Sequence, residues 1–240
     1  MGKHCKGIRM KERVEQLLRF SYKNQTTHIA SALSQLDFIY ELFTKELVVP
    51  FRDRIILGKP FGSQSLLMAW KEMGYLDNID SYGFVRHGEI PFIDFSEFSL
   101  GNAMGVAAGM AIACPNQLVW CHISDGALQM GNTLEAIQFI GHNKLKNVMV
   151  TVDYNGGQVT GKIDDILTVE PVIDFFKGYG WDVNFDLTNF KVDDNPKVFI
   201  MRTVKGQGVP SIEKDIRKWH YKKIESYEEL QSLVAELRAT

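Results

Sequence analysis

Two short apolar segments constrain the fold of this chain most, because each ends at a polar residue that could hold an ion. Residues 118–123 and 148–152 are rich in β-branched and aromatic side chains, which is typical of buried strands. An Asp-Gly pair at Asp125 follows the first segment, and Asn155 with two glycines follows the second. Such sequences also occur in ordinary turns, so either one alone would indicate little.

The residues between these segments have the spacing of a helix. Apolar side chains recur at Leu134, Ile137 and Ile140, and Gly141 weakens the pattern only slightly. A strand, a helix and a second strand form a right-handed βαβ unit, so both strands run parallel and end at the same edge of the sheet. Asp125 and Asn155 are therefore predicted to be neighbours in space.

This pair of residues suits a divalent metal ion bound to a diphosphate. Small hard cations take carboxylate, amide and backbone carbonyl oxygens together with substrate phosphates. Ligands of open α/β sheets bind at the carboxyl edge, where Gly126, Gly156 and Gly157 would let the backbone approach closely. We predict that Asp125 and Asn155 hold such an ion.

Four segments, in a consistent order over roughly residues 10–222, resemble the transketolase family. Residues 124–161 resemble its thiamine diphosphate motif, which is Gly-Asp-Gly followed after about thirty residues by Asn. Residues 27–40 are similar to its N-terminal His-containing segment, and residues 98–111 to its glycine-rich helix. Residues 203–210, with Trp219-His220 beyond, resemble its final signature.

The resemblance implies an α/β, three-layer thiamine diphosphate-binding fold with a central mainly parallel sheet and helices on both faces. It implies a single diphosphate-binding domain over residues 1–240, with an N-terminal helical segment over 1–50 and a C-terminal helix over 224–240. Complete transketolases add a pyrimidine-binding domain and a third domain. We therefore expect a split enzyme, in which this N-terminal subunit forms an α2β2 heterotetramer with a C-terminal subunit and is inactive alone.

The same resemblance assigns roles to particular residues. It implies Mg²⁺, or Ca²⁺ or Mn²⁺, held by Asp125, Asn155 and the carbonyl of Gly157. The residues implied to contact thiamine diphosphate are Ser99, Leu100, Gly101, Asp125, Gly126, Ala127, Asn155 and His220. The residues implied to be catalytic are His28, His87, His220 and Glu135. Imidazoles suit this work because they can donate, accept and exchange protons near neutral pH.

Several positions depart from the family pattern. Phe61 replaces a His, Phe98 replaces a Gly before Leu100, and Met130 stands where the family often has Glu. Ser124 replaces the first Gly of the metal motif, which is a mild change at a strand end. These departures predict an altered substrate or weaker cofactor binding, but they leave Asp125 and Asn155 in place.

The implied reaction is transfer of a two-carbon ketol group from a ketose donor to an aldose acceptor, with sugars or sugar phosphates as substrates. Two alternatives stay open at this point. The first is a thiamine diphosphate subunit of a 2-oxo acid dehydrogenase or decarboxylase. The second is a non-catalytic scaffold subunit, which Phe61, Phe98 and Met130 would favour.

Composition excludes other classes of function. The hydrophobic share of 45% and charged share of 23% are typical of a globular chain. A net charge of −2 with scattered Lys and Arg predicts no nucleic acid partner. The longest apolar run, residues 103–114, is too short to span a bilayer, so we expect no membrane partner. Three cysteines without paired spacing and no signal-peptide core predict a cytoplasmic location.

The remaining pattern predicts further elements. Helices are expected over residues 9–23, 28–47, 63–74, 100–113 and 225–237, a third strand over 198–204, irregular structure over 78–98, and a shortened crossover over 182–197. Gly101, Gly105 and Gly109 recur every fourth residue, which predicts a smooth helix face packed tightly inside the domain. The resemblance places this helix near the cofactor and the subunit interface.

Overall fold

A parallel six-stranded sheet forms the centre of the computed structural model, which describes residues 10–80 and 82–240. The strands are β1 (Arg54–Leu57), β2 (Phe95–Ser96), β3 (Val119–Ser124), β4 (Val148–Tyr154), β5 (Asp182–Asn184) and β6 (Lys197–Arg202). Their order is β2-β1-β3-β4-β6-β5, and every neighbouring pair is parallel. The predicted α/β fold with a mainly parallel sheet is confirmed.

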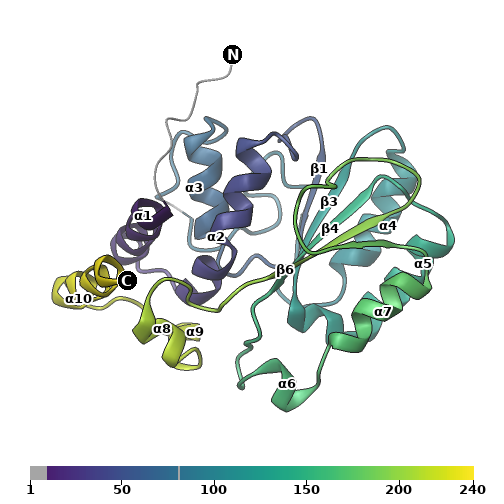
Figure 1. The fold of residues 1–240 in the computed structure, drawn as a ribbon. Helices are drawn as coiled ribbons and strands as arrows, with labels where there is room; N and C mark the ends of the chain where they lie inside the picture. The colour runs from purple at the N-terminus through teal and green to yellow at the C-terminus, as the bar shows by residue number, and fades with distance from the viewer. Residues whose placement is uncertain (1–9, 81) are drawn as a thin grey trace.

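Helices cover both faces of this sheet (Figure 1). The longer ones are α1 (Met10–Lys23), α2 (Ile29–Thr44), α3 (Gln64–Glu72), α4 (Ala103–Ala113), α5 (Gly131–His142), α7 (Glu170–Gly178) and α10 (Tyr227–Ala239). The short ones are η1 (Asp125–Gln129), α6 (Ile163–Ile166), α8 (Pro210–Lys214) and α9 (Lys218–Tyr221).

Two hydrophobic cores arise because successive residues of a strand point to opposite faces of the sheet. In β1, Ile55 and Leu57 join the core that includes side chains of α1, α2, α3 and α10. Ile56, between them, joins the core that includes side chains of α4, α5 and α7. The chain is therefore built in three layers, with the sheet in the middle.

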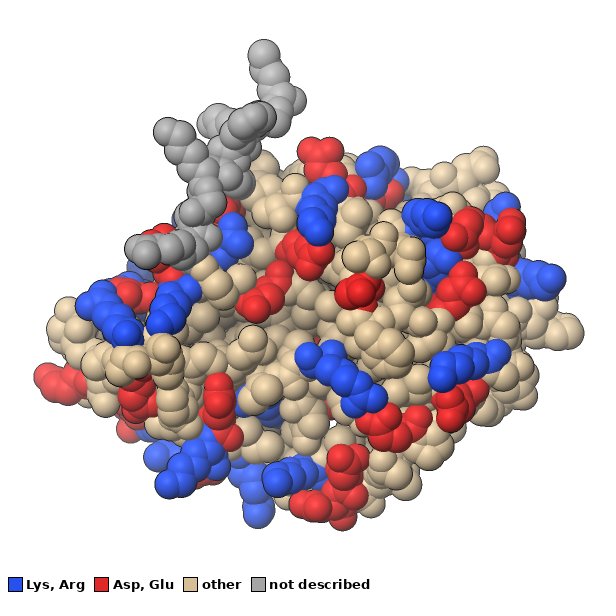
Figure 2. Space-filling model, in the orientation of Figure 1, with Lys and Arg blue, Asp and Glu red and all other residues tan. Residues whose placement is uncertain are grey.

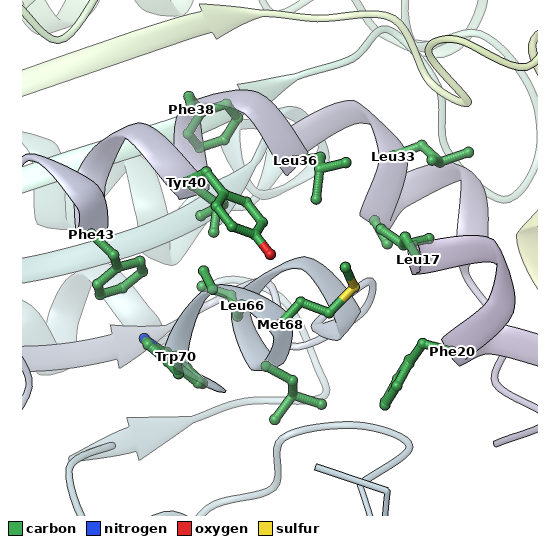
Figure 3. Packing of buried hydrophobic residues seen from close by; sticks show 14 of the residues in the cluster. Leu17, Phe20, Leu33, Leu36, Phe38, Tyr40, Phe43, Leu66, Met68 and Trp70 are labelled. Atoms are coloured by element: carbon green, nitrogen blue, oxygen red, sulfur yellow. The ribbon is translucent and has the colours of Figure 1, made fainter. Parts of the chain in front are cut away.

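The first core is formed largely by aromatic and long aliphatic side chains of α1, α2 and α3, which Figure 3 shows packed together. The ring of Phe43 lies edge-on to both Trp70 and Trp120, with centroids 5.7 Å apart in each case. Since Trp120 belongs to β3, these contacts fasten α2 and α3 to the central strand.

The predicted βαβ unit is present and positions the candidate site. Strand β3 leads through η1 and α5 to the parallel strand β4, and Ser124 lies opposite Asp153 in the register between them. Asp125 directly follows the last residue of β3, and Asn155 directly follows the last residue of β4, so both lie at the same edge of the sheet, as the sequence predicted. The edge at which both strands end also receives the chain leaving β1 and β6.

Several elements differ from the sequence prediction. Strands β1, β2 and β5 and helix α7 were not predicted, because three of the four are short and none carries a long periodic pattern. Helix α2 was expected over 28–47 but covers Ile29–Thr44, since His28 has left-handed backbone angles. The charged segment 182–197 contains β5 and reaches the start of β6. The parts of the N-terminal prediction over residues 1–9, including Cys5, lie outside the described residues.

The prediction that the glycine face of α4 packs inside the domain is wrong for Gly105 and Gly109, whereas Gly101, just before the helix, is buried. Gly105 and Gly109 are exposed, and a methyl group added at either would meet no atom within 4 Å. The opposite face of α4, with Ala103, Ala107 and Ala111, packs into the second core. Gly105 and Gly109 therefore form part of the molecular surface.

Other predictions from composition concern the surface. On the face shown in Figure 2, basic and acidic side chains of the described residues are interspersed, without a continuous basic area. Within residues 10–80 and 82–240, no helix is long and apolar enough to cross a membrane. Cys114 and Cys121 are free thiols.

Candidate active site

A cavity of about 400 Å³ opens at the carboxyl ends of β3 and β4. The residues predicted from sequence that line it are His28, Leu100, Asp125, Gly126, Asn155, Gly157 and His220. This is the edge at which parallel sheets bind ligands, because the loops after the strands converge there.

Asp125 and Asn155 are both held by backbone groups of the neighbouring loops. The two carboxylate oxygens of Asp125 accept hydrogen bonds from the N–H groups of Gly126 and Gly156, each at 2.8 Å. The side-chain oxygen of Asn155 accepts from the Gly157 N–H at 3.1 Å. Each of these oxygens can accept a further partner, so both residues can still bind an ion.

The donor set fits a hard cation bound together with phosphate oxygens. The carbonyl oxygen of Gly157 already accepts a hydrogen bond from the ammonium of Lys205 at 2.7 Å, so a positive group lies at this predicted metal ligand. Among the described residues, no cluster of three or more His, Cys, Asp or Glu could hold a metal. An ion here would therefore use one carboxylate with amide and carbonyl oxygens, which is a set that Mg²⁺ accepts when phosphates complete it.

Burial makes the charges of this cavity costly without a ligand. Burial raises the pKa of Asp125 to about 6, and the nearby charge of Asp153 acts in the same direction. Burial lowers the pKa of Lys205 to about 8, with the charge of Lys59 adding to the effect. A bound cation beside Asp125 and a bound anion beside Lys205 would stabilise both charged forms.

A second pair of charges is formed by Lys59, which lines the cavity, and Asp153, which lies beneath it, and both are fully hydrogen-bonded. The ammonium of Lys59 forms an ion pair with Asp153 and also donates to Gln35 Oε1 at 2.7 Å and to the Ser31 carbonyl at 3.1 Å. Asp153 is completely buried. Burial disfavours its charged form, but Lys59 and hydroxyl donors hold the pKa of Asp153 below its usual value.

His122 extends this network into the sheet. Its Nε2 lies 2.9 Å from Gln35 Oε1, which can only accept, and its Nδ1 lies 3.0 Å from Thr151 Oγ1. These partners assign a neutral imidazole with the proton on Nε2. Burial, with the charge of Lys59, lowers the pKa of His122 to about 3.

The low pKa of His122 predicts a loss of stability in acid. Below the ordinary pKa of 6.5 the unfolded chain takes up a proton that the folded chain refuses, so stability falls as the pH drops from 6.5 toward 3. When the pH is lowered from 7.5 to 5, the free energy of unfolding measured in urea should fall by about 2 kcal/mol less in His122→Gln than in the wild type. His142→Gln, on the exposed end of α5, is the control and should follow the wild type. Equal losses in the wild type and His122→Gln would contradict the prediction.

Two further histidines meet at the wall of the cavity. The rings of His28 and His220 lie edge to face with centroids 4.7 Å apart, and the His28 N–H donates to the His220 carbonyl at 3.1 Å. Burial first, then the charges of His220, Lys205 and Lys59, lowers the pKa of His28 to about 3. Burial and the same two lysines lower the pKa of His220 to about 4. Both imidazoles are therefore neutral near pH 7 and can orient hydroxyl groups.

The backbone of His28 is strained. Its φ is 60° and its ψ is 28°, which is the left-handed region that residues with a side chain rarely adopt. Such strain is often found at functional sites, where the surrounding structure maintains it. Here it allows His28 to precede α2 while its ring faces the cavity.

A pair of substitutions at His28 measures this strain. The free energy of unfolding should be about 1 kcal/mol larger for His28→Gly than for His28→Ala. Alanine still has a side chain that is strained in the left-handed conformation, whereas glycine does not. At Ser31, inside α2, the order should reverse, with Ala more stable than Gly by about 1 kcal/mol. Urea denaturation of the four variants gives both differences. If Ala were the more stable residue at both positions, the strain at His28 would be absent.

Aromatic side chains form one side of the cavity mouth. Phe61 stacks on His28 with centroids 4.8 Å apart and lies edge-on to Phe98 at 5.6 Å. Phe84 contacts both Phe61 and Phe98. The departures at Phe61 and Phe98 therefore act together, and they replace polar or open positions by an apolar wall.

Other predicted site residues lie outside the cavity. His87 and Ser99 are exposed, and the ring of His87 faces Phe95. Gly101 and Glu135 line a separate groove between α4 and α5, and Ala127, which belongs to η1, is buried. Their predicted roles remain predictions.

Sequence reasoning missed Ser31, Lys59, Lys205 and Asp153. Ser31, Lys59 and Lys205 line the cavity, and Asp153 lies directly beneath it. Both lysines lie in segments that were compared with the family, because Lys59 is two residues before Phe61 and Lys205 is within the final signature. However, an isolated lysine in sequence is usually a surface residue.

Comparison with known proteins agrees with this geometry. Residues 106–225, half of the chain, match the family model described as "Transketolase, thiamine diphosphate binding domain". The chain is 26% identical to one of the subunits of the apulose-4-phosphate transketolase of Phocaeicola vulgatus, over 92% of this chain and 91% of that protein. It is 28% identical to the 6-deoxy-6-sulfo-D-fructose transketolase subunit SqwG of a Clostridium species, over 88% of each.

The fold is also that of solved transketolases. The structure of the transketolase from Campylobacter jejuni superimposes with a TM-score of 0.77 at 20% identity, covering 97% of this chain. This chain spans only 43% of that protein. Together with the match over residues 106–225 and the cavity at the ends of β3 and β4, these comparisons show that the chain belongs to the transketolase family and contains its thiamine diphosphate-binding domain.

Proposed function

We propose that this chain is the diphosphate-binding subunit of a two-component transketolase, which transfers a two-carbon ketol group from a ketose donor to an aldose acceptor. The observation that carries the proposal is the cavity itself, where Asp125 and Asn155 from adjacent strand ends face His28 and His220. The match in length to relatives named as transketolase subunits supports the division into two chains.

The residues present suit the cofactor and metal that this function requires. Asp125, the side-chain oxygen of Asn155 and the Gly157 carbonyl would hold Mg²⁺, and Lys205 would then donate to the diphosphate. A Cβ atom added at Gly157 would lie 2.7 Å from Ile216 Cδ1 and 2.8 Å from Lys205 Cδ, so any larger residue there would displace the Lys205 side chain. When bound, thiamine diphosphate supplies the nucleophile and the electron sink for breaking the bond beside a ketose carbonyl.

The protein's own groups bind and orient. Neutral His28 and His220 can each donate or accept a hydrogen bond, so they would position substrate hydroxyls and pass protons between them. The aromatic wall of Phe61, Phe84 and Phe98 would exclude water from one side of the substrate.

The partner would be a C-terminal transketolase subunit with the pyrimidine-binding domain, in an α2β2 heterotetramer. The groove between α4 and α5 supports contacts between subunits, because exposed Gly105 and Gly109 give a smooth surface beside the exposed side chains of Ile112 and Phe139. Light scattering of the copurified pair would give the mass. A 1:1 pair without further assembly would contradict the heterotetramer.

The test of the function is reconstitution with the protein encoded by the neighbouring reading frame. The pair should transfer a ketol group between a ketose and an aldose, while either chain alone should not. Sugar phosphates and a sulfonated sugar belong in the substrate panel, because relatives are named for both kinds. Turnover of 2-oxo acids in place of ketoses would favour a dehydrogenase-type subunit. No heat on titration of the pair with thiamine diphosphate and Mg²⁺ would favour a scaffold.

A further inference from the structure

We propose that Asp153, whose buried charge is compensated by Lys59, is a positioning residue, which fixes the side-chain amide of Asn155 so that its oxygen faces the metal position. The inference rests on the proposed function for the identity of the ligand. Asn155 can only bind a cation through its oxygen, and its amide could be turned by 180° with little change in shape. Something in the fold must therefore choose between the two orientations.

The carboxylate of Asp153 makes that choice because it can only accept hydrogen bonds. Its Oδ2 accepts from Asn155 Nδ2 at 2.8 Å. The reversed amide would place two oxygen atoms against each other in a site from which water is excluded, since Asp153 is fully buried. The nitrogen of Asn155 thus faces Asp153, and the oxygen faces the opposite side.

Asp153 is itself held in place by donors from three separate parts of the chain. Ser34 Oγ in α2 donates to its Oδ2 at 2.6 Å, and Thr203 Oγ1, just after β6, donates to its Oδ1 at 2.6 Å. The ammonium of Lys59, after β1, completes the set. The orientation of Asn155 is therefore set by a network anchored in the core and not only by the loop that follows it.

Lys59 belongs to this network and not to the group of ligand-binding residues. Its ammonium has three N–H bonds, and the acceptors Asp153, Gln35 and Ser31 use all three. Lys205 differs, because Gly157 is its one close acceptor, with His220 Nδ1 at 3.4 Å. Of the two lysines that line the cavity, Lys205 is the one with an N–H available to an anion.

A second contact acts in the same direction. The Gly157 N–H donates to the Asn155 oxygen at 3.1 Å, so the amide is held from both ends. This bond lies within a two-residue turn, whereas Asp153 connects Asn155 to the core. Removing Asp153 should leave the turn in place, and it should leave the nitrogen end of the amide with only its longer bond to Ser34 Oγ, at 3.4 Å.

The test uses neutral pairs, so that no double variant leaves Lys59 as an unpaired buried charge. The variants are Lys59→Met alone, Lys59→Met with Asp153→Leu, and Lys59→Met with Asp153→Asn, all in the full chain. In the last pair, the Asn oxygen can still accept from Asn155. Nuclear magnetic resonance of the ¹⁵N-labelled chain without ligand follows hydrogen exchange of the Asn155 side-chain amide, which is assigned by its loss in Asn155→Asp.

We expect the Asn155 amide to exchange slowly in the wild type, in Lys59→Met and in the pair with Asn. In the pair with Leu it should exchange at least about tenfold faster, because its carboxylate acceptor is gone. Equal protection in the pair with Leu and in Lys59→Met would overturn the proposal.

Calorimetry of the chain in complex with its partner provides a second readout. The quantity measured is the Mg²⁺ concentration that gives half-maximal binding of thiamine diphosphate. It should be about 10- to 100-fold higher in the pair with Leu than in Lys59→Met, as is typical when a residue that hydrogen-bonds a metal ligand is removed. When excess EDTA removes the metal, thiamine diphosphate should bind equally well to the pair with Leu and to Lys59→Met. An equal loss with and without Mg²⁺ would overturn the positioning role in favour of a general structural one. If the wild-type complex bound no cofactor, the proposed function would fail, while amide exchange would still decide how Asn155 is held.

Discussion

Asp125→Ala is expected to abolish Mg²⁺-dependent binding of thiamine diphosphate to the chain and its partner. Asp125 supplies the one carboxylate among the predicted metal ligands, and its two oxygens are fixed by the N–H groups of Gly126 and Gly156. Burial raises the pKa of Asp125 to about 6, so the folded chain disfavours this charge when no cation is bound. The variant also leaves these two N–H groups without their acceptor, which should cost about 1–3 kcal/mol of stability, but it should still fold.

Two measurements separate these effects. In calorimetry, the heat of cofactor binding in Mg²⁺ should disappear. In thermal unfolding, ligand at 100 times its dissociation constant stabilises a protein by about 2.7 kcal/mol, and this gain should be absent from the variant. Asp174→Ala, on an exposed residue of α7, is the matched control and should keep both signals. Undiminished binding by Asp125→Ala would refute the metal assignment.

Lys59→Met is expected to lower the free energy of unfolding by about 3–5 kcal/mol, because it leaves the buried carboxylate of Asp153 without its counter-ion. The side chain of Lys59 is only 5% exposed and that of Asp153 is not exposed at all. Water therefore cannot replace the lost ammonium, although Ser34 and Thr203 still donate to the carboxylate. Urea unfolding followed by circular dichroism gives the change.

The double substitution of Lys59→Met with Asp153→Leu should be more stable than Lys59→Met alone, since it removes the uncompensated charge. Lys205→Met is the control for loss of a buried lysine. The pKa of Lys205 is lowered by its burial, so the folded state disfavours that charge, and its removal should not destabilise the chain. A larger loss in Lys205→Met than in Lys59→Met would show that the pairing with Asp153 does not decide the stability.

Local sequence patterns were sufficient for the central βαβ unit. The apolar runs of β3 and β4 and the helical spacing between them predicted both parallel strands and the meeting of Asp125 with Asn155. The family resemblance added His28 and His220, which the structure places at the same cavity. Short strands such as β1 carried too little pattern to be recognised, and the glycine face of α4 showed no sign of which side would be buried.

The sequence by itself determined the central βαβ unit and the two strand ends that form the candidate metal site, because both follow from periodicity within about forty residues. The layered α/β fold was implied by the family resemblance. Only the tertiary structure decided how the site is held. Lys59 and Asp153 are 94 residues apart along the chain, and Ser34 and Asp153 are 119 apart. No local pattern relates such residues, since their contact depends on how β1, α2 and β4 pack around one buried carboxylate. The same packing buries Asp125 and Lys205, and this burial shifts the pKa values of both side chains.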